Sequence, residues 1–573
     1  MKTSGRTAFP SNGVVTGSAV SATVRSVFAC ARSGAASESL PAGQFAKSVL
    51  AGLLVAAALS LPSCLLASAC SSNPVERAEI VPPYDTSDTT ADGSADLAVP
   101  DGGTKDLGSG DGGSGDGGSG DGGQVDTGAD ETGPPPPLFD MALIANAADA
   151  NCVWSNPHTV IKDITPVDVW NVTYTSYEVV DGQLHPILIK GFAAKPSLVS
   201  ATLPGVVVAH GLGGMAKEEN ATGPAALLGT VTLAFTGPGG GDAPDNTSEG
   251  VPAAADNGYK MFDTVEDPRG TWFWGHAVAA MRAATCLEHS QYVDPARLGI
   301  TGFSAGGVIS LISSSVDQRI KVAVPLSGTL AWDIAVQAPK AWQLTLLDKA
   351  GLTTSSPEWG TLMNTIIGAG VLLPGSQAKV MMVNGTTDEF FPLTAHMASF
   401  NALPGAEKRT AFAANFDHGC YSLTGIESAA DIENRAKIRA EGGQRAFFSH
   451  HFGTDPDFSY FPMLPTVQAQ AAGPITFVTA LVDQGGSKLK VEEVRFWLSN
   501  DDAFYFASQK LDDNGNGLYS AMIPVGLQAN SVYFVDVQYK TSNFIFPKQF
   551  ALASPPAIPA GFVPHIRDIN SCL

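Results

Sequence analysis

One serine lies in a run whose residue types and spacing suit nucleophilic chemistry. It is Ser304, in Gly302-Phe303-Ser304-Ala305-Gly306, which follows a short apolar stretch and precedes residues that can start a buried helix. A Gly-x-Ser-x-Gly run between a strand and a helix is typical of a nucleophile elbow, a sharp turn that needs small neighbours because its serine backbone is strained. The pattern predicts that Ser304 is a nucleophile and that the Ala305 N–H, at a helix N-terminus, faces developing negative charge. The alternative is a Gly-rich turn with a structural role only.

A serine hydroxyl is a weak nucleophile until a base takes its proton, and that base needs an orienting carboxylate. His418 is the candidate base because, of the ten histidines, it alone follows the last expected core strand in a loop. Asp388 is the candidate acid, since it directly follows a buried strand whose carboxyl end reaches the same edge of the sheet as the elbow. Two other carboxylates are alternatives for this role, namely Asp333, after the preceding strand, and Glu389.

Two glycine-rich runs follow expected strands and could contribute backbone donors. His210-Gly211-Leu212-Gly213-Gly214 comes after the apolar run 205–209. A second oxyanion donor belongs at that place, so we expect the Leu212 N–H to complete an oxyanion hole with that of Ala305. The run 237–241 is expected to shape the rim of the pocket. We do not expect it to bind a dinucleotide, because no Gly-x-Gly-x-x-Gly opens a helix there.

The elements that must position these residues alternate between β-rich runs and helical stretches from about 138 to 455. This alternation predicts an α/β domain with a mostly parallel sheet. Residues 329–377 lie between two core strands and are too long for a bare loop, so we expect a cap over the site. The expected strands are an antiparallel pair over 167–180 and 184–192, then 205–209, 231–235, the run into the elbow, 322–326, 380–383 and 410–416, with helices over 272–289 and 427–452.

Beyond residue 461 the pattern consists of strands alone. Six runs are expected, over 474–483, 491–498, 503–510, 517–524, 532–539 and 543–550. Their number and length predict a small all-β sandwich over 465–555. It contains no catalytic constellation, so we expect it to pack against the α/β domain, with binding of a polymer or wall as the alternative.

The chain has 573 residues, which allows more than one domain, and its net charge of −22 excludes nucleic acid as an expected partner. Much of that charge lies in residues 71–137, which hold fourteen Asp/Glu, two Lys/Arg and repeats of Asp-Gly-Gly-Ser-Gly. With almost no large apolar side chains, this stretch is expected to be a disordered tether.

The N-terminus has the features of an export signal. Lys47 precedes an apolar run from Val49 to Leu61, which has the length of a signal peptide rather than a membrane span. The following Leu66-Ala67-Ser68-Ala69-Cys70 resembles a bacterial lipobox, with Cys70 as the lipidated residue; plain secretion is the alternative. We therefore expect an exported protein, in the cell envelope or secreted, that contacts a membrane only through a lipid anchor.

If Cys70 is acylated, four cysteines remain for disulfides in an oxidising compartment. They are Cys152, Cys286, Cys420 and Cys572, and the sequence does not choose among their three pairings. The expected organisation is a signal peptide with lipobox (1–70), a tether (71–137), an α/β domain (138–455, cap 329–377), a β-sandwich (465–555) and a tail (556–573).

Residues 155–455 resemble the α/β-hydrolase superfamily, nearest to its acetyl-xylan esterase, dienelactone hydrolase and prolyl-oligopeptidase branches. The resemblance implies an α/β-hydrolase fold in which Ser304, Asp388 and His418 form a catalytic triad, with no metal or cofactor. It covers a little over half of the chain. The motifs that carry it are 210–214, 237–241, Val293-Asp294-Pro295-Ala296-Arg297-Leu298-Gly299-Ile300, 302–307, Gly385-Thr386-Thr387-Asp388 and Asp417-His418-Gly419.

The expected function is hydrolysis of a carboxylic ester, small or polymeric, through an acyl-enzyme intermediate. Two alternatives remain. The same triad could serve a serine peptidase of the prolyl-oligopeptidase type. A surface binding protein with an inactive hydrolase body is the other. The residues do not indicate an acyl length, an alcohol partner or an oligomeric state.

Overall fold

The computed structural model describes residues 137–418, 427–543 and 545–566. The expected signal peptide, the lipobox with Cys70, the tether up to residue 136, Cys420 and Cys572 lie outside these ranges. Within them, every helix is too short or too polar to cross a lipid bilayer.

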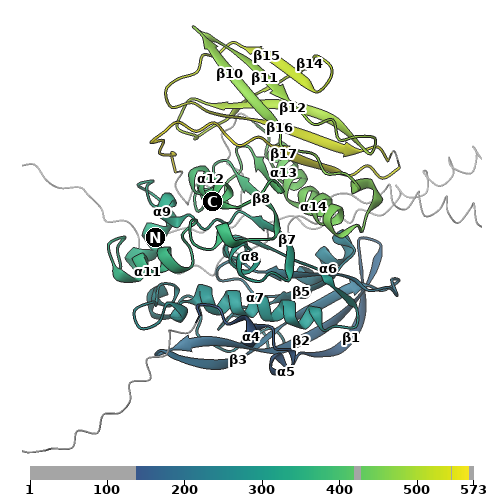
Figure 1. Ribbon diagram of the computed structural model, residues 1–573, viewed down its shortest axis with the longest axis vertical. Coiled ribbons are helices and arrows are strands. Elements are labelled where there is room, and N and C mark those ends of the chain that lie inside the picture. Colours follow the sequence, from purple (N-terminus) through teal and green to yellow (C-terminus); the bar gives the residue numbers. More distant parts are fainter. Residues whose placement is uncertain (1–136, 419–426, 544, 567–573) are drawn as a thin grey trace, which may run out of the picture. The chain divides into compact units, whose positions relative to one another are not determined.

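The body of the described chain is a nine-stranded mixed sheet in the order β1-β2-β3-β5-β4-β6-β7-β8-β9 (Figure 1). The first three strands pair in antiparallel fashion, and β3 is also antiparallel to β5. All the remaining neighbours are parallel, which confirms the expected α/β class. The strands are β1 (Val153–Lys162), β2 (Thr165–Val180), β3 (Gln183–Pro196), β4 (Leu203–Ala209), β5 (Val231–Phe235), β6 (Val293–Phe303), β7 (Ile320–Leu326), β8 (Lys379–Gly385) and β9 (Lys408–Ala413).

The hairpin of β2 and β3 turns at Asp181 and Gly182, whose φ angles are 50° and 68°. Two left-handed residues make the two-residue turn whose twist matches that of antiparallel strands. Strand β1 was not expected, and most of its side chains are exposed or half-buried. It lies at the edge of the sheet and buries no apolar face, so it lacks the alternation by which strands are detected. The expected strand over 410–416 begins and ends earlier, as β9.

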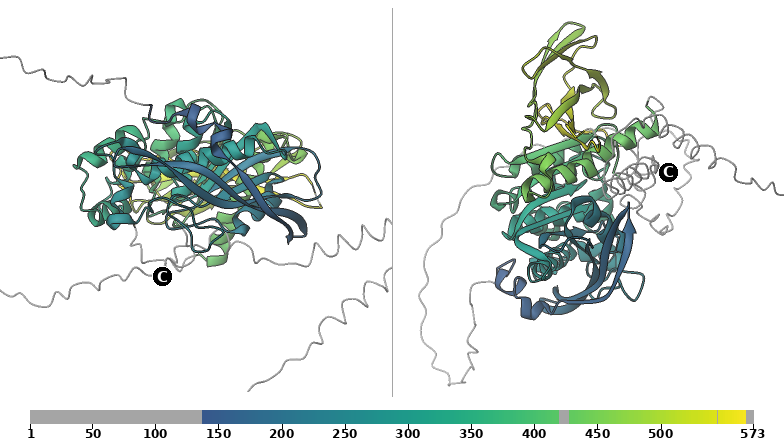
Figure 2. Two further views of the ribbon diagram at one scale, coloured as in Figure 1. Left: turned by 90° about the horizontal axis from the view of Figure 1, so that it is seen from below. Right: turned by 90° about the vertical axis from the view of Figure 1, so that its right-hand side faces the viewer.

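Helices cover both faces of the sheet, as the views of Figures 1 and 2 show. In β4, Val207 packs into the cluster that contains α7 and α8, whereas Val206 packs with Phe447 and Phe448 of α14. Helix α6 packs on β2, β3 and β5 and contacts α14. The helices are α4 (Met141–Ile144), α5 (Ala147–Ala150), α6 (Glu218–Leu228), α7 (Trp272–Glu288), α8 (Ala305–Val316), α12 (Leu393–Ala402), α13 (Ala429–Lys437) and α14 (Gly443–Phe452), with 3₁₀ turns η1 (Ala255–Met261), η2 (Pro268–Gly270) and η5 (Pro456–Phe458).

The prediction of a single helix over 427–452 is wrong, because the segment is interrupted. Helices α13 and α14 are separated by a π-helical turn, η4 (Ile438–Gly442). A Cβ on Gly442 would lie 2.2 Å from the Gln549 carbonyl oxygen, so this segment lies directly against the C-terminal strand that follows. The interruption therefore occurs where another part of the chain packs on the helix.

The expected cap segment contains three short helices between β7 and β8. They are α9 (Trp332–Ala335), α10 (Trp342–Lys349) and α11 (Pro357–Thr365), followed by the 3₁₀ turn η3 (Leu373–Gly375). Cys152 and Cys286 form a disulfide with their Cα atoms 5.7 Å apart, which joins the start of β1 to α7. The structure thus pairs two of the four cysteines whose pairing the sequence left open.

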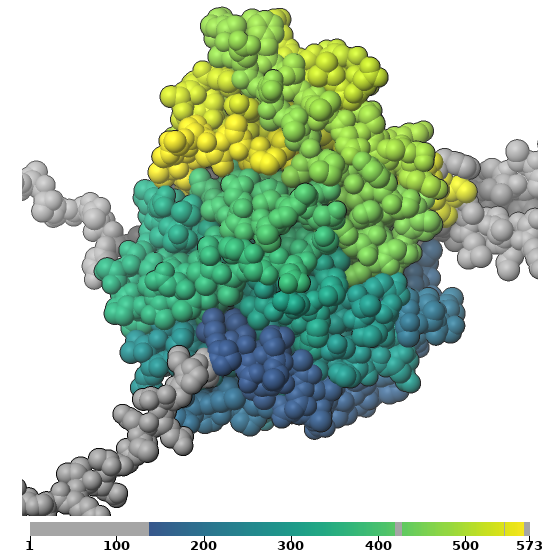
Figure 3. Space-filling model, in the orientation of Figure 1, coloured from purple at the N-terminus to yellow at the C-terminus, as the bar shows by residue number. Residues whose placement is uncertain are grey.

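The C-terminal β-region, residues 466–553, consists of two four-stranded sheets, β10-β11-β15-β14 and β13-β12-β16-β17. Side chains from both sheets pack together, for example Val478 with Phe496 and Val535. In Figure 3 this region (yellow-green to yellow) adjoins the green part of the α/β domain. The strands are β10 (Thr466–Ala472), β11 (Ile475–Leu481), β12 (Leu489–Ser499), β13 (Ala507–Lys510), β14 (Asp512–Asp513), β15 (Leu518–Ile523), β16 (Val532–Thr541) and β17 (Gln549–Ala553).

The expected all-β composition of this region agrees with the structure, but its details differ. Strands β10 and β14 lie outside the expected runs, and the strands expected from 503 and from 543 begin at Ala507 and Gln549. Asp502 and Ala503 have φ angles of 58° and 65°, which an extended strand excludes. Within the expected tail, Ala557 forms a β-bridge with Tyr533.

Candidate active site

Ser304 stands at the sharp turn between β6 and α8, with φ 60° and ψ −124°. Its N–H donates to the Leu326 carbonyl oxygen at 2.9 Å. A Cβ on Gly302 or Gly306 would lie 2.5 or 2.1 Å from the carbonyl oxygen of Ala209 at the end of β4. The two glycines of the motif are therefore required by the close approach of β4, and the strained serine backbone is held between β4 and β7.

His418 and Asp388 meet Ser304 at this edge of the sheet. His418 Nε2 lies 2.7 Å from Ser304 Oγ, and its Nδ1 lies 3.0 Å from each carboxylate oxygen of Asp388. A carboxylate only accepts, so Nδ1 carries the proton and Nε2 is free to accept the serine proton. The structure thus brings together the three side chains selected from the sequence, and all three are buried.

The Asp388 carboxylate is oriented by main-chain donors. Its Oδ1 accepts hydrogen bonds from the N–H groups of Phe390 at 3.0 Å and Phe391 at 2.8 Å. These bonds hold the carboxylate toward the imidazole. The alternative acid, Asp333, is an exposed residue of α9 and makes no described contact with His418.

Glu389 is buried beside the triad and has a different role from Asp388. Its Oε2 accepts the main-chain N–H of His418 at 3.0 Å, so it contacts the backbone rather than the ring. Burial, followed by the neighbouring charge of Asp388, raises the pKa of Glu389 to about 7. Two carboxylates therefore flank one histidine, and one of them titrates near neutrality.

The segments with the two expected oxyanion donors adjoin Ser304. The Ala305 N–H is the first of α8, so it has no acceptor within the helix. Leu212 lies in a turn closed by the Gly214 N–H, which donates to the Gly211 carbonyl at 3.0 Å, with Gly213 at φ 71°. A Cβ on Gly211 would be 3.3 Å from Ser304 Cβ, so this turn lies against the elbow.

His210 links the two glycine-rich loops, a contact that the sequence did not indicate. Its Nδ1 donates to the Gly211 carbonyl at 2.6 Å, and its Nε2 accepts the Gly237 N–H at 2.8 Å. Burial lowers the pKa of His210 to about 4, so the ring is neutral at physiological pH, as this donor–acceptor pair requires. Buried His276 packs on the ring at 4.7 Å, and its pKa is also lowered by burial. The position of His210 directly before Gly211 is the one feature of the sequence that could have indicated this contact.

Aromatic rings surround the His418 imidazole. The ring centroids of Phe390, Phe303 and Phe391 lie 4.4, 4.9 and 5.4 Å away. Trp342, from α10 of the cap segment, stacks on Phe390 at 4.6 Å, and the Gln343 side chain donates to the Phe390 carbonyl at 2.7 Å. The cap segment therefore packs directly on a side chain that contacts the imidazole. No local pattern in the sequence indicates this particular contact.

Other parts of the described chain offer no comparable chemistry. In ranges 137–418, 427–543 and 545–566, no group of three or more His, Cys, Asp or Glu side chains could hold a metal ion. A cavity of about 350 Å³ lies in the C-terminal β-region, lined by residues such as Phe496, Leu498 and Ile523. Its lining includes one carboxylate, Asp501, and no histidine, lysine or cysteine, so no Ser-His-Asp arrangement like that at Ser304 occurs there.

Comparison with protein families gives two matches in this part of the chain. The acetyl xylan esterase family model matches residues 155–349, which include the elbow and both glycine-rich loops. The prolyl oligopeptidase family model matches residues 277–434, which include Ser304, Asp388 and His418. Among curated proteins, none matches the chain.

Solved structures similar to this chain include esterases and a peptidase. The acetyl xylan esterase from Paenibacillus sp. R4 is 18% identical over 51% of this chain and 89% of its own, with a TM-score of 0.40. Acetyl xylan esterase 1 from Thermoanaerobacterium sp. JW/SL YS485 is 18% identical over 50% and 88%, with a TM-score of 0.38. Porphyromonas gingivalis dipeptidyl peptidase 4 is 16% identical over 50% and 42%, with a TM-score of 0.33.

Proposed function

We propose that this chain, which carries a domain of the α/β-hydrolase superfamily, hydrolyses carboxylic esters with Ser304 as nucleophile. One observation carries the proposal: His418 Nε2 lies 2.7 Å from Ser304 Oγ while Asp388 accepts the other ring N–H at 3.0 Å. This is the arrangement in which a hydroxyl loses its proton to imidazole as it attacks an acyl carbon.

The reaction proceeds in two halves. His418 takes the Ser304 proton as Oγ attacks the acyl carbon, and Asp388 stabilises the imidazolium that forms. The N–H groups of Leu212 and Ala305 stabilise the oxyanion. The carbon–oxygen ester bond then breaks, and the imidazolium gives its proton to the departing alcohol. Water, deprotonated by His418, attacks the acyl-enzyme and releases the acid and the free serine.

An ester is the preferred substrate class because its alkoxide leaves more readily than an amine. The acetyl xylan esterase match, which includes both glycine-rich loops, supports the same choice. The prolyl oligopeptidase match includes all three triad residues and makes peptide cleavage the second candidate. A binding protein with an inactive body has no support from the triad geometry.

Turnover of p-nitrophenyl acetate and of peptide anilides by the purified full chain distinguishes these functions. We expect ester turnover that Ser304→Ala abolishes, and labelling of Ser304 by a fluorophosphonate, located by mass spectrometry. Anilide cleavage without ester cleavage would favour the peptidase. A folded protein with neither turnover nor labelling would contradict both enzymatic proposals.

We also propose that the protein is exported and anchored through Cys70. The disulfide between Cys152 and Cys286 supports export, because disulfides persist in oxidising compartments. Mass spectrometry of the mature N-terminus tests the anchor: a diacylated Cys70 is expected, and a protein that begins at Cys70 without lipid, or still carries the first 69 residues, would contradict it.

A further inference from the structure

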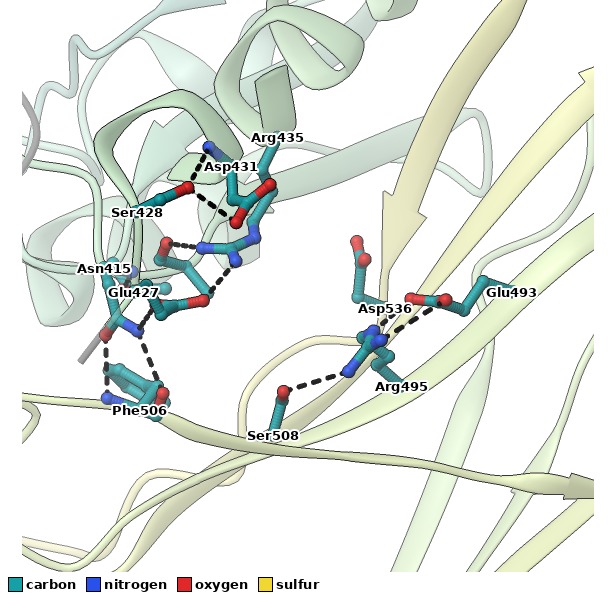
Figure 4. A network of polar contacts seen from close by, with 12 residues as sticks. Asn415, Glu427, Ser428, Asp431, Arg435, Glu493, Arg495, Phe506, Ser508 and Asp536 are labelled. Atoms are coloured by element: carbon teal, nitrogen blue, oxygen red, sulfur yellow. Dashed lines mark hydrogen bonds and ion pairs between the residues drawn. The ribbon is translucent and has the colours of Figure 1, made fainter. Parts of the chain in front are cut away.

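The segment just before His418 is hydrogen-bonded to the C-terminal β-region. Asn415, three residues before His418, accepts the Phe506 main-chain N–H at 2.8 Å and donates to the Phe506 carbonyl at 2.9 Å (Figure 4). Both residues are fully buried. Phe506 directly precedes β13, so a strand end from a region without catalytic groups of its own holds the loop of the candidate base.

We propose that the C-terminal β-region is a working part of the active site, and that Asn415 is the positioning residue through which it sets the place of His418. This inference rests on the proposed function, because it assigns a task only if His418 is the base. On this proposal the C-terminal β-region is a support for the active site rather than a separate binding module, and its removal or loosening would displace the His418 imidazole.

The asparagine also ties the histidine loop to the acid loop. Its backbone is left-handed, with φ 60°, and its N–H donates to Thr386 Oγ1 at 2.9 Å. The two loops share further main-chain bonds, from Thr386 N–H to the Ala413 carbonyl at 3.1 Å and from Thr387 N–H to the Phe416 carbonyl at 3.3 Å. Asp388 and His418 thus belong to one hydrogen-bonded unit, and Phe506 holds that unit from outside.

A second connection runs through charged groups. Asn415 Nδ2 also donates to Glu427 at 2.7 Å, and Glu427 forms an ion pair with Arg435. The Arg435 guanidinium donates to the Ala414 carbonyl at 2.7 Å and lies 4.7 Å over the ring of Trp497 in β12. Figure 4 shows Glu427 between Asn415 and Arg435. The β-region therefore contacts the segment just before His418 directly through Phe506, and β12 is linked to the same segment through Arg435.

Buried side chains join the two regions. The ring of Phe534 in β16 packs on Phe412 of β9 at 5.6 Å and on Phe506 at 5.6 Å. Arg439 of η4 and Asp536 of β16 form an ion pair that is buried on both sides. Contacts between loosely docked domains are more polar than this, so we expect the β-region and the loop to move as one body.

Removing the asparagine side chain should act on the rate more than on binding. Without it, the Phe506 N–H and carbonyl are buried and unpaired, which drives local rearrangement. The serine–histidine bond depends on geometry, and a displacement of about 1 Å in such a group costs on the order of 100-fold in rate. The groups around the acyl carbon stay in place, so the apparent affinity for substrate should change little.

Asn415→Gly is the sharpest variant, because glycine accepts the left-handed backbone without strain and removes only the side chain. We expect kcat on p-nitrophenyl acetate to fall about tenfold to 100-fold, with KM within about threefold. Ser304 should still label completely with a fluorophosphonate, at a lower rate. Amide hydrogen exchange should increase in peptides that contain 410–418.

Lys548→Met is the matched control. It removes the ion pairs of Lys548 with Asp455 and Asp457, which also join the β-region to the hydrolase body but make no described contact with residues 414–418. We expect kcat and exchange over 410–418 to be unchanged in this variant. An equal loss of kcat in both variants would show a general effect of destabilisation and would overturn the inference.

Asn415→Asp covers the case in which the glycine variant does not fold. It has the same shape and keeps the acceptor for the Phe506 N–H, but it loses both Nδ2 donations, so kcat should fall at least about fivefold. A kcat within twofold of wild type in either folded variant overturns the positioning role. Failure of the proposed function would be a separate result, in which the wild type itself neither hydrolyses esters nor reacts with the fluorophosphonate. In that case amide hydrogen exchange over residues 410–418 is the measurement that decides the positioning role.

Discussion

Glu389 Oε2 accepts the main-chain N–H of His418 at 3.0 Å, while Asp388, the preceding residue, accepts the ring N–H of the same histidine at 3.0 Å. Consecutive residues of one loop therefore hold the backbone and the side chain of the candidate base. Burial, and then the like charge of Asp388, raises the pKa of Glu389 to about 7, and this gives the site a titration that the triad alone would not have.

The first prediction concerns stability and pH. The pKa of Glu389 is raised from 4.5 to about 7, so the native state holds a proton that the unfolded chain releases. The contribution of Glu389 to the free energy of unfolding is therefore fully present below about pH 4.5 and is lost as the pH rises to about 7. The loss amounts to roughly 3 kcal/mol at most. Glu389→Gln should remove this part of the pH dependence. Urea unfolding of both proteins at pH 5, 6, 7 and 8 measures it, and parallel curves would contradict it.

The second prediction separates the three carboxylates. Asp388→Asn should lower kcat about 10³- to 10⁴-fold, because an amide cannot hold the imidazole in the required tautomer. Glu389→Gln keeps an acceptor for the His418 N–H and should stay within about tenfold of wild type. Asp333→Asn, at an exposed position, is the control and should have no effect. Kinetics on p-nitrophenyl acetate rank the three, and a larger loss for either of the latter two would reassign the acid.

The third prediction concerns the elbow glycine. A Cβ at position 306 would lie 2.1 Å from the Ala209 carbonyl oxygen, a backbone atom that cannot move aside. Gly306→Ala should therefore destabilise the fold by about 3 kcal/mol or more. Gly360, inside α11, has nothing within 4 Å of its Cβ position, so Gly360→Ala should stabilise by up to about 1 kcal/mol through helix propensity. Thermal unfolding compares them, and equal shifts would disprove the close approach.

The fourth prediction assigns specificity to the cap segment. Trp342 stacks on Phe390, whose ring lies 4.4 Å from that of His418. Trp342→Ala should open space beside the imidazole and raise the ratio of kcat/KM for p-nitrophenyl butyrate over acetate about tenfold. Trp342→Phe keeps a ring on Phe390 and should leave the ratio within threefold, as a rough bound. An unchanged ratio in the alanine variant would place acyl selection elsewhere.

Much of the framework was predictable because its signals are local. The glycines around Ser304 mark a strained turn, and the left-handed pair Asp181 and Gly182 closes a hairpin between two amphipathic runs. Asp388 and His418 could be selected because each follows a strand that ends at the same edge of a parallel sheet. Such patterns depend on neighbours within a few residues, so they can be recognised without knowledge of the tertiary structure.

The remaining features depend on segments that meet only after folding. Nothing near Asn415 in sequence indicates Phe506, which is 91 residues away, and the Cys152–Cys286 bond spans 134 residues. The stacking of Trp342 on Phe390 and the edge strand β1 likewise depend on packing rather than on periodicity. The sequence alone therefore determined which residues could react and the elements that carry them. Only the tertiary structure decided which distant groups hold those residues in place, because side-chain contacts follow the path of the whole chain.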